Sequence, residues 1–341
     1  MFRVFATTEQ RMPLSQIAQH ARRAEKLGYD GLNVPEAVHD GLLAAAAALA
    51  ATEHLSVATS VLVAFPRSPM TVAHAAWDLQ ETSGGRFELG LGPQVRANIV
   101  NRYSTSWTAP VPRMRDYVNS LRAIFDCWQN GSALQFEGAH YQFSRMQPFF
   151  HPGPVTGGPP PIHLGAIGPG MLALAGELAD GLMTHPTNTA PRYLREAIIP
   201  RLAEGAKRVG RTGDALRLMI GGLCATGPND EQTSSERENA RQLLGFLYST
   251  PAYWKSLELL GLDDLGPRLK AMVAEGRWSD LAGQVPDSLV DATVPSAPYA
   301  EIAERLTDWY GELSDWITFP MPDDPACDDA AADVITRLKS G

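Results

Sequence analysis

The segment 166–171, Ala-Ile-Gly-Pro-Gly-Met, has the clearest potential for chemistry in this sequence. It lies between a short apolar stretch and a helical pattern, so its backbone N–H groups are expected at a helix start, where they can bind an anion. Pro169 suits the first helical turn, and Gly168 and Gly170 leave room for phosphate oxygens. The segment therefore predicts a phosphate site, with Arg67 as a candidate for the opposing cation. An ordinary loop between a strand and a helix is the alternative.

Ionisable side chains follow a second predicted strand, residues 29–34, and these are Glu36, His39 and Asp40. Histidine titrates near neutral pH and suits proton transfer. A carboxyl group such as that of Glu36 can do the same when burial raises its pKa. His39 and Glu36 are therefore the candidate catalytic acids, and His185, which follows a later strand, is a further candidate. For His39, a plain surface loop residue is an equally good interpretation.

Two further predicted strands carry unusual residues near their carboxyl ends. The strand 55–64 is apolar except for Thr59 and Ser60, where an ordinary core strand would carry Val or Ile. A later strand ends in Gly90-Leu-Gly92, and glycines at this place allow a flat ring or a phosphate to approach the backbone. A regular strand with two tolerated hydroxyls, followed later by a plain tight turn, is the alternative.

Several aromatic residues fall in predicted loops. In that position they are candidates for an apolar cover over a bound ligand, and simple packing of the loops on the rest of the protein is the alternative. They are Trp107, Phe149, Phe150, Tyr248 and Tyr253.

The cysteines and the remaining histidines predict no metal site. Cys127, Cys224 and Cys327 are far apart and lack Cys-x-x-Cys spacing, which argues against a disulfide framework and against structural zinc. No pair of histidines has metal-ligand spacing with an accompanying carboxylate.

The elements that position these residues alternate between short apolar strands and helices. This alternation with short loops is the signature of parallel βαβ units, and eight predicted strands match a TIM (β/α)8 barrel, formed by residues 1–341 as a single domain. The irregular segment 130–160 predicts an insertion, or lid, between the fourth helix and the fifth strand, with a small hairpin that pairs 134–136 with 141–143. The predicted strands are residues 2–6, 29–34, 55–64, 87–91, 161–165, 180–184, 216–225 and 316–320.

The composition is that of a globular protein without a general nucleic-acid surface. Of the 341 residues, 44% are hydrophobic and 20% are charged, and the formal net charge is −9 at pH 7. The alanine-rich run 42–51 is too short to span a bilayer, and the first residues lack a signal-peptide pattern. We therefore expect a cytoplasmic protein that takes neither nucleic acid nor membrane as a partner.

Four of these motifs, in their order and spacing, resemble the bacterial luciferase-like flavin and deazaflavin oxidoreductases. The similarity covers the chain from Phe2 to about Pro322 and is greatest to the branch that uses the deazaflavin coenzyme F420. The resemblance implies a barrel of the luciferase-like type. The motifs are Phe65-Pro-Arg-Ser-Pro69, Ser83-Gly-Gly-Arg-Phe87, Gly90-Leu-Gly92 and Ala166-Ile-Gly-Pro-Gly-Met171.

The resemblance also implies a cofactor site. A cis peptide bond that supports the back of the cofactor ring falls at Ser60–Val61, and Asn98 stands where the family contacts the cofactor side chain. The family usually has a hydroxyl residue at Pro93, so one hydrogen bond is expected to be missing or moved to Gln94. The candidate cofactor-binding residues are Ser60, Val61, Arg67, Gly92, Pro93, Gln94, Asn98, Ala166, Gly168, Pro169, Gly170 and Met171.

The acid–base position departs from the family. Many of its deazaflavin enzymes carry a histidine near the ring in the loop after the second strand, but here Ala37 and Val38 occupy the nearest positions and His39 is displaced. The resemblance further implies a homodimer formed through the helices 41–53 and 69–82.

The leading hypothesis is an oxidoreductase that transfers a hydride between coenzyme F420 and an organic substrate, reducing an activated C=C, C=N or C=O group of a small-molecule or peptide-derived compound. Arg67, Arg96 and Arg102 would face the oligoglutamate tail of F420. An FMN-dependent luciferase-like monooxygenase is the first alternative. The second is a cofactor-free barrel that acts as a binding subunit, which Pro93 and Ala37 favour.

Overall fold

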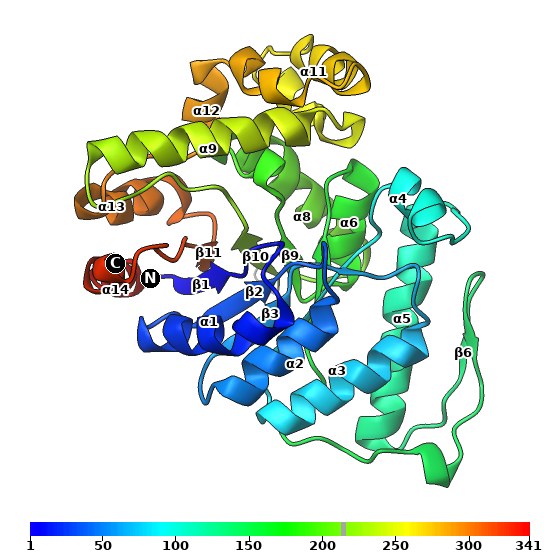
Figure 1. Cartoon of the computed structure of the whole chain (residues 1–341). Helices are drawn as coiled ribbons and strands as arrows, with labels where there is room; N and C mark the ends of the chain where they lie inside the picture. Colours follow the sequence, from blue (N-terminus) through cyan, green and yellow to red (C-terminus); the bar gives the residue numbers. More distant parts are fainter. Residues whose placement is uncertain (213–215) are drawn as a thin grey trace.

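The computed structural model describes residues 1–212 and 216–341, in which parallel strands close into a barrel surrounded by helices (Figure 1). β3 pairs with β2 on one side and with β5 on the other, which closes the ring. β3 and β4 share one position, so these described strands fill eight positions and confirm the predicted TIM barrel. The strands are β1 (Arg3–Thr7), β2 (Gly31–Val34), β3 (Ser56–Thr59), β4 (Leu62–Val63), β5 (Phe87–Gly92), β8 (Ile162–Gly165), β9 (Gly181–Met183), β10 (Arg217–Ile220) and β11 (Trp316–Thr318).

Two of the helices around the barrel begin at a side chain that caps them. Asp40 accepts hydrogen bonds from the N–H groups of Leu42 and Leu43 at the start of α2, and Ser68 caps α3. Pro200 follows a π-helical turn that interrupts the helix predicted for 191–209, because proline lacks the N–H group that a regular helix needs. The helices are α1 (Leu14–Lys26), α2 (Gly41–Ala51), α3 (Pro69–Ser83), α4 (Arg96–Asn101), α5 (Pro110–Asn130), α6 (Pro169–Leu178), α7 (Pro191–Tyr193), α8 (Ile199–Arg208), α13 (Tyr299–Tyr310) and α14 (Asp328–Ser340).

The interior of the barrel is filled with side chains toward the amino-terminal ends of the strands. The His163 Nε2 atom lies 2.7 Å from a carboxylate oxygen of Glu88, and Arg3 donates to the other oxygen at 3.3 Å. Burial raises the pKa of Glu88, but the hydrogen bond and charge of His163 outweigh this effect and lower the pKa. Phe5 and Trp316 stack beside this cluster, with ring centroids 3.7 Å apart. A ligand is therefore expected at the other end, at the carboxyl ends of the strands.

A first insertion follows α5. It contains the predicted hairpin with a different register, since Phe136 pairs with Phe143 and Glu137 with Gln142 in β6 (Phe136–Glu137) and β7 (Gln142–Phe143). The rest runs along the far ends of α3 and α5, where Trp77 donates to the carbonyl of Gly153 and Gln80 to that of Gly158. Most of the predicted lid 130–160 therefore lies toward the amino-terminal end of the barrel.

A second insertion, residues 226–297, lies between β10 and α13 and forms the upper part of the molecule in Figure 1. Its helices pack around a hydrophobic core of their own, which includes Leu244, Leu269 and Leu289. The sequence predicts helices over about 231–248 and 251–260 but neither of the last two, and Gly266 and Pro267 obscure the helical pattern where α11 begins. The helices are α9 (Asp230–Tyr248), α10 (Lys255–Leu259), α11 (Leu265–Ala274) and α12 (Asp287–Thr293).

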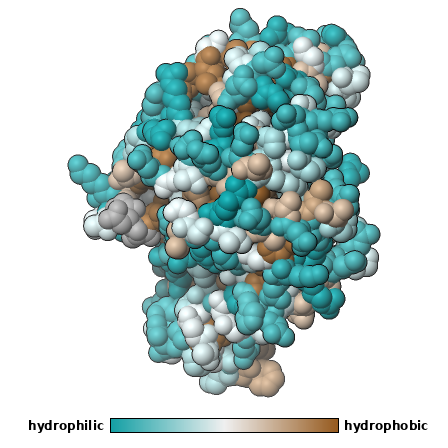
Figure 2. Space-filling model, turned by 90° about the vertical axis from the view of Figure 1, so that its left-hand side faces the viewer, coloured by the Kyte–Doolittle hydropathy of each residue, from teal (hydrophilic) through white to brown (hydrophobic). Residues whose placement is uncertain are grey.

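The surface is largely hydrophilic on the face shown in Figure 2, where hydrophobic residues form small separate patches. Single apolar side chains on such a surface are ordinary and mark no site by themselves. Within 1–212 and 216–341, no helix has both the length and the apolar character that crossing a membrane requires.

Candidate active site

The residues singled out in the sequence follow five strands that are neighbours around the barrel, namely β2, β3/β4, β5, β8 and β9. Because the strands are parallel, the loops after them meet at one side of the same barrel end. The structure therefore brings the candidate acids, the interrupted strand and the glycine-rich loops to a common edge.

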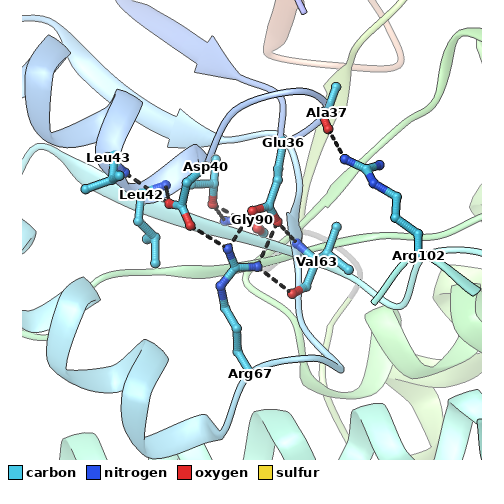
Figure 3. Close-up of polar contacts among 10 residues, drawn as sticks. Glu36, Ala37, Asp40, Leu42, Leu43, Val63, Arg67, Gly90 and Arg102 are labelled. Atoms are coloured by element: carbon cyan, nitrogen blue, oxygen red, sulfur yellow. Dashed lines mark hydrogen bonds and ion pairs between the residues drawn. The ribbon is translucent and has the colours of Figure 1, made fainter. Parts of the chain in front are cut away.

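The loop after β2 is held by the side chain of Arg67 (Figure 3). The guanidinium binds both carboxylate oxygens of Glu36, at 2.6 and 2.9 Å, and one oxygen of Asp40 at 2.7 Å. The N–H of Val63 donates to Glu36 at 2.6 Å, and the carbonyl of Val63 accepts from Arg67 at 3.0 Å. One arginine thus joins the loop after β2 to β4 and to the start of α2.

The charges in this network stabilise one another. Burial alone lowers the pKa of Arg67, but the hydrogen bonds and charges of Glu36 and Asp40 outweigh it and raise the pKa. Burial likewise raises the pKa of Asp40, and donors from Leu43 and Arg67 outweigh it and lower the pKa. The structure places Arg67 inside this network, and its predicted contact with a phosphate stays a prediction. Since Arg67 and a backbone N–H only donate, both oxygens of Glu36 act as acceptors.

The other side of the same loop is anchored by Arg102, which follows α4. Arg102 donates a hydrogen bond to the carbonyl oxygen of Ala37 (Figure 3). Val38 and His39 lie between the two anchors and are exposed. His39 is therefore presented to solvent from a loop that is fixed on both sides.

The interruption between β3 and β4 has the geometry that the family resemblance implied. The Ser60–Val61 peptide bond is cis. The hydroxyl of Thr59 donates to the carbonyl of Gly90 at 2.8 Å and accepts from its N–H at 2.9 Å, so it replaces the strand pairing that the interruption removes. This accounts for a hydroxyl residue in a buried strand. A Cβ atom at Gly92 would lie 2.6 Å from the Val61 side chain, so that glycine gives Val61 its space.

The loop after β5 forms a compact turn after Pro93. Gln94 has a φ of 61°, and its side-chain oxygen accepts from the N–H of Val95 at 2.8 Å and from Asn98 at 3.2 Å. Gln94 and Asn98 thus bind each other at the start of α4. Their contacts with a cofactor stay predictions.

The predicted anion site lies at the start of α6, where Gly168 is the N-cap residue. No side chain among the described residues caps this helix, as is also the case for α1, α4 and α5, whereas α2 and α3 are capped by Asp40 and Ser68. Gly168, Pro169 and Gly170 are exposed, and Ala166 and Met171 flank them as buried residues. The first-turn N–H groups are therefore left for an external acceptor.

The aromatic residues predicted to cover a bound ligand lie in different parts of the structure and do not form one cover. Tyr253 stacks on His185, which follows β9, with ring centroids 4.4 Å apart. Tyr248 is buried, and Trp107 contacts Phe65 at the edge of the barrel. Phe149 and Phe150 are exposed in the first insertion, where a short helical turn holds them. Among the described residues, no group of three or more His, Cys, Asp or Glu side chains is placed to hold a metal ion.

The family model of the luciferase-like monooxygenases matches residues 1–315. The chain belongs to this family. Its relatives and structural neighbours include oxidoreductases, so the protein is an enzyme of the luciferase-like oxidoreductase class.

Two relatives illustrate the similarity in sequence. An uncharacterized protein of Mycobacterium tuberculosis is 39% identical over 293 residues, which cover 86% of each chain. The F420-dependent glucose-6-phosphate dehydrogenase of Nakamurella multipartita is 31% identical over 226 residues, which cover 63% of this chain and 64% of the dehydrogenase.

Two solved structures share the fold. The coenzyme F420 dependent tetrahydromethanopterin reductase of Methanopyrus kandleri superposes with a TM-score of 0.80 at 18% identity and covers 99% of both chains. The oxygenating constituent of 3,6-diketocamphane monooxygenase from Pseudomonas putida, in complex with FMN, superposes with a TM-score of 0.69 at 15% identity, covering 99% of this chain and 98% of the other.

Proposed function

We propose that the protein is an F420-dependent oxidoreductase that transfers a hydride between the deazaflavin and an organic substrate. The observation that carries the proposal is the uncapped, exposed start of α6 at the same barrel end as the interrupted strand β3/β4. The two are close, since a Cβ atom at Gly165, the last residue of β8, would lie 3.0 Å from the Val61 side chain. A cofactor with a ring and a phosphate on its side chain needs both features close together. The interrupted strand would support the ring, and the N–H groups of α6 would bind the phosphate. The relative from Nakamurella multipartita, named for its F420 dependence, supports this choice of cofactor.

The chain's residues fit such a group in a specific arrangement. The N–H groups of Gly170 and Met171 would bind the phosphate, and the half-buried Val61 would support the ring. The exposed Arg96 and Arg102 on and after α4 would face the carboxylates of the tail. When bound, F420 supplies a carbon that donates or accepts the hydride.

The substrate in this proposal is a small-molecule or peptide-derived compound with an activated C=C, C=N or C=O group. The protein would orient that group and provide the proton for the atom that does not receive the hydride. A homodimer formed through α2 and α3 is part of the proposal, and Leu43 on α2, which is 59% exposed, offers an apolar contact for it.

An FMN-dependent monooxygenase is the second candidate, because one structural neighbour holds FMN and both cofactors carry a ring and a phosphate. The anionic tail distinguishes them, since FMN has none. Binding of F420 should therefore depend on exposed arginines that FMN does not reach.

Gly168→Asp is expected to weaken the binding of F420 at least tenfold, or about 1.4 kcal/mol, without loss of stability. An aspartate at an N-cap position would bind the free N–H groups itself and would repel a phosphate. Space is available, since nothing lies within 4 Å of a Cβ atom at Gly168. Fluorescence titration gives the affinity and thermal unfolding gives the stability, which should stay equal or rise.

Gly283→Asp is the matched control, because Gly283 is exposed, has open space and lies in the second insertion. It should leave the affinity unchanged. Equal affinity of the Gly168 variant and the wild type would exclude the start of α6 as the phosphate site. A Cβ atom at Gly170 would lie 3.2 Å from Val111 in α5. A variant at Gly170 would therefore also disturb α5, and a loss of affinity could not be assigned to the phosphate site alone.

Arg96→Gln should weaken F420 binding roughly fivefold, about 1 kcal/mol, and leave FMN binding unchanged. Its side chain is exposed on α4, so the fold should not depend on it. The difference between variant and wild type should shrink as salt is added, because exposed charges are screened. Tight FMN binding that F420 does not displace would replace the proposed function with the monooxygenase.

A further inference from the structure

His185 is held by contacts on several sides at the site end of the barrel. It lies two residues after β9 and is half-buried, and its ring lies on that of Tyr253 with an interplanar angle of 20°. Tyr253 belongs to the second insertion, so the insertion reaches the loops after the barrel strands at this point. One face of the imidazole is therefore covered.

A hydrogen-bond chain fixes the loop that carries His185. The backbone N–H of His185 donates to the side-chain oxygen of Asn188 at 2.7 Å. The side-chain nitrogen of the same buried Asn188 donates to the carbonyl oxygen of Ala166 at 3.2 Å. Asn188 thus couples His185 directly to the loop that leads into the predicted phosphate site.

The second insertion also contacts the loop that carries His185, through the side chain of Tyr248. The hydroxyl of Tyr248 donates to the carbonyl oxygen of Thr187 at 3.1 Å and lies 3.1 Å from the hydroxyl of Ser256. Tyr248 is fully buried in the insertion. The helical insertion therefore holds the His185 loop between its own core and the barrel.

The hydrogen bonds of the imidazole select one tautomer. The Nδ1 atom accepts from the backbone N–H of Thr187 at 3.3 Å and lies 2.8 Å from the Thr187 hydroxyl. A backbone N–H can only donate, so Nδ1 carries no proton and the proton of the neutral ring is on Nε2. Within the described residues Nε2 makes no hydrogen bond, and it is not among their fully buried polar atoms without a partner.

The ring is also expected to stay neutral at neutral pH. Burial lowers the pKa of His185 to about 4, and no charged group among the described residues contributes to this shift. A neutral imidazole is a poor proton donor but a good hydrogen-bond donor through Nε2–H. An anionic substrate group would find no positive charge here, whereas a carbonyl oxygen or an imine nitrogen would find a fixed N–H group.

We propose that His185 recognises the substrate by donating a hydrogen bond from Nε2 to the oxygen or nitrogen of an uncharged C=O or C=N group conjugated to the reacting bond. The hydride transfer to that substrate rests on the proposed function. The neutral ring of His185 and its preference for an uncharged acceptor do not depend on it. The second insertion is then the element that sets the position of this contact. An N–H group fixed in advance toward the substrate atom that gains negative charge would stabilise the transition state.

Histidine-labelled protein tests the proposal by ¹⁵N NMR, with 2-cyclohexen-1-one at millimolar concentration as the probe. The His185 signals should show the neutral Nε2–H tautomer from about pH 5 to about pH 8, and the probe should shift Nε2. His185→Phe keeps the ring stack on Tyr253 but lacks the N–H, and His185→Gln keeps a donor. Saturation transfer to the enone should be lost in the first variant and retained, though weaker, in the second.

A charged ring at neutral pH, a proton on Nδ1, or equal enone binding by His185→Phe and the wild type would each overturn the proposal. A titration of both variants with F420 separates this outcome from the proposed function. Cofactor affinity should match that of the wild type, because neither variant touches the start of α6. Failure of the wild-type protein itself to bind F420 would reject the proposed function and leave the NMR result on His185 valid.

Discussion

Arg67→Met is expected to lower the free energy of unfolding by about 3 kcal/mol. Arg67 is the partner of both oxygens of Glu36, whose side chain is only 5% exposed. Removal of the guanidinium leaves that carboxylate buried with only the N–H of Val63 to bind it. An uncompensated buried charge is more costly than the loss of a surface ion pair. Urea denaturation of the purified variant measures the change.

The matched control is Arg192→Met, which breaks the ion pair of Arg192 with Glu196 on one helix. Their side chains are 60% and 50% exposed, so the expected change is about 0.5 kcal/mol or less. The double variant Glu36→Gln/Arg67→Met should be more stable than Arg67→Met alone, because it no longer buries a charge. Equal effects of Arg67→Met and Arg192→Met would show that the network contributes no more than a surface pair.

This network explains why a motif read as a cofactor contact has a structural task. The sequence predicts a phosphate contact for Arg67 but not this network, because an arginine after a strand gives no sign of its partners. Glu36 and Asp40 lie 31 and 27 residues from it along the chain, and the parallel pairing of β2 with β3 brings the two loops together. Partnerships between loops of neighbouring strands are set by tertiary structure and carry no local pattern.

The barrel itself was readable because each strand and helix has a local signal. Apolar runs such as 87–91 and caps such as Ser68 indicate the elements without reference to any long-range contact. The second insertion was only partly readable, since Gly266 and Pro267 interrupt the helical pattern where α11 begins. The Val61 side chain fills the space beside Gly92. A glycine that makes room for a side chain and one that makes room for a ligand look the same in the sequence.

The site residues also divide into those that the sequence predicts and those that it does not. The uncapped start of α6 follows from Gly168 and Pro169 alone and has the form expected from the sequence. Asn188 was missed, because a buried asparagine that joins two loops has no spacing rule. Its neighbours Thr187 and Thr189 are polar as well, so the sequence gives no sign that this stretch is buried in the structure.

The largest effect on the reaction is expected at His39, which the family resemblance places one or two residues from the usual histidine. Ala37 holds the position expected nearest to the cofactor ring. Its side chain cannot transfer a proton, and its carbonyl oxygen accepts a hydrogen bond from Arg102. Glu36 uses both oxygens as acceptors for Arg67, and His185 is held neutral by burial. His39 is exposed and makes no hydrogen bond within the described residues, so its imidazole is free to give a proton to a bound substrate.

His39→Gln should therefore lower turnover with reduced F420 by ~10²–10⁴-fold, the usual contribution of general acid catalysis. Because the side chain is exposed and without partners in the described structure, F420 affinity and thermal stability should stay at wild-type values. His54→Gln, at an exposed histidine just before β3, is the control and should change neither rate nor affinity. Glu36→Gln is the less decisive variant, since it also weakens the Arg67 network and lowers stability. Wild-type turnover of His39→Gln from about pH 5 to about pH 9 would exclude His39 and leave water as the source of the proton.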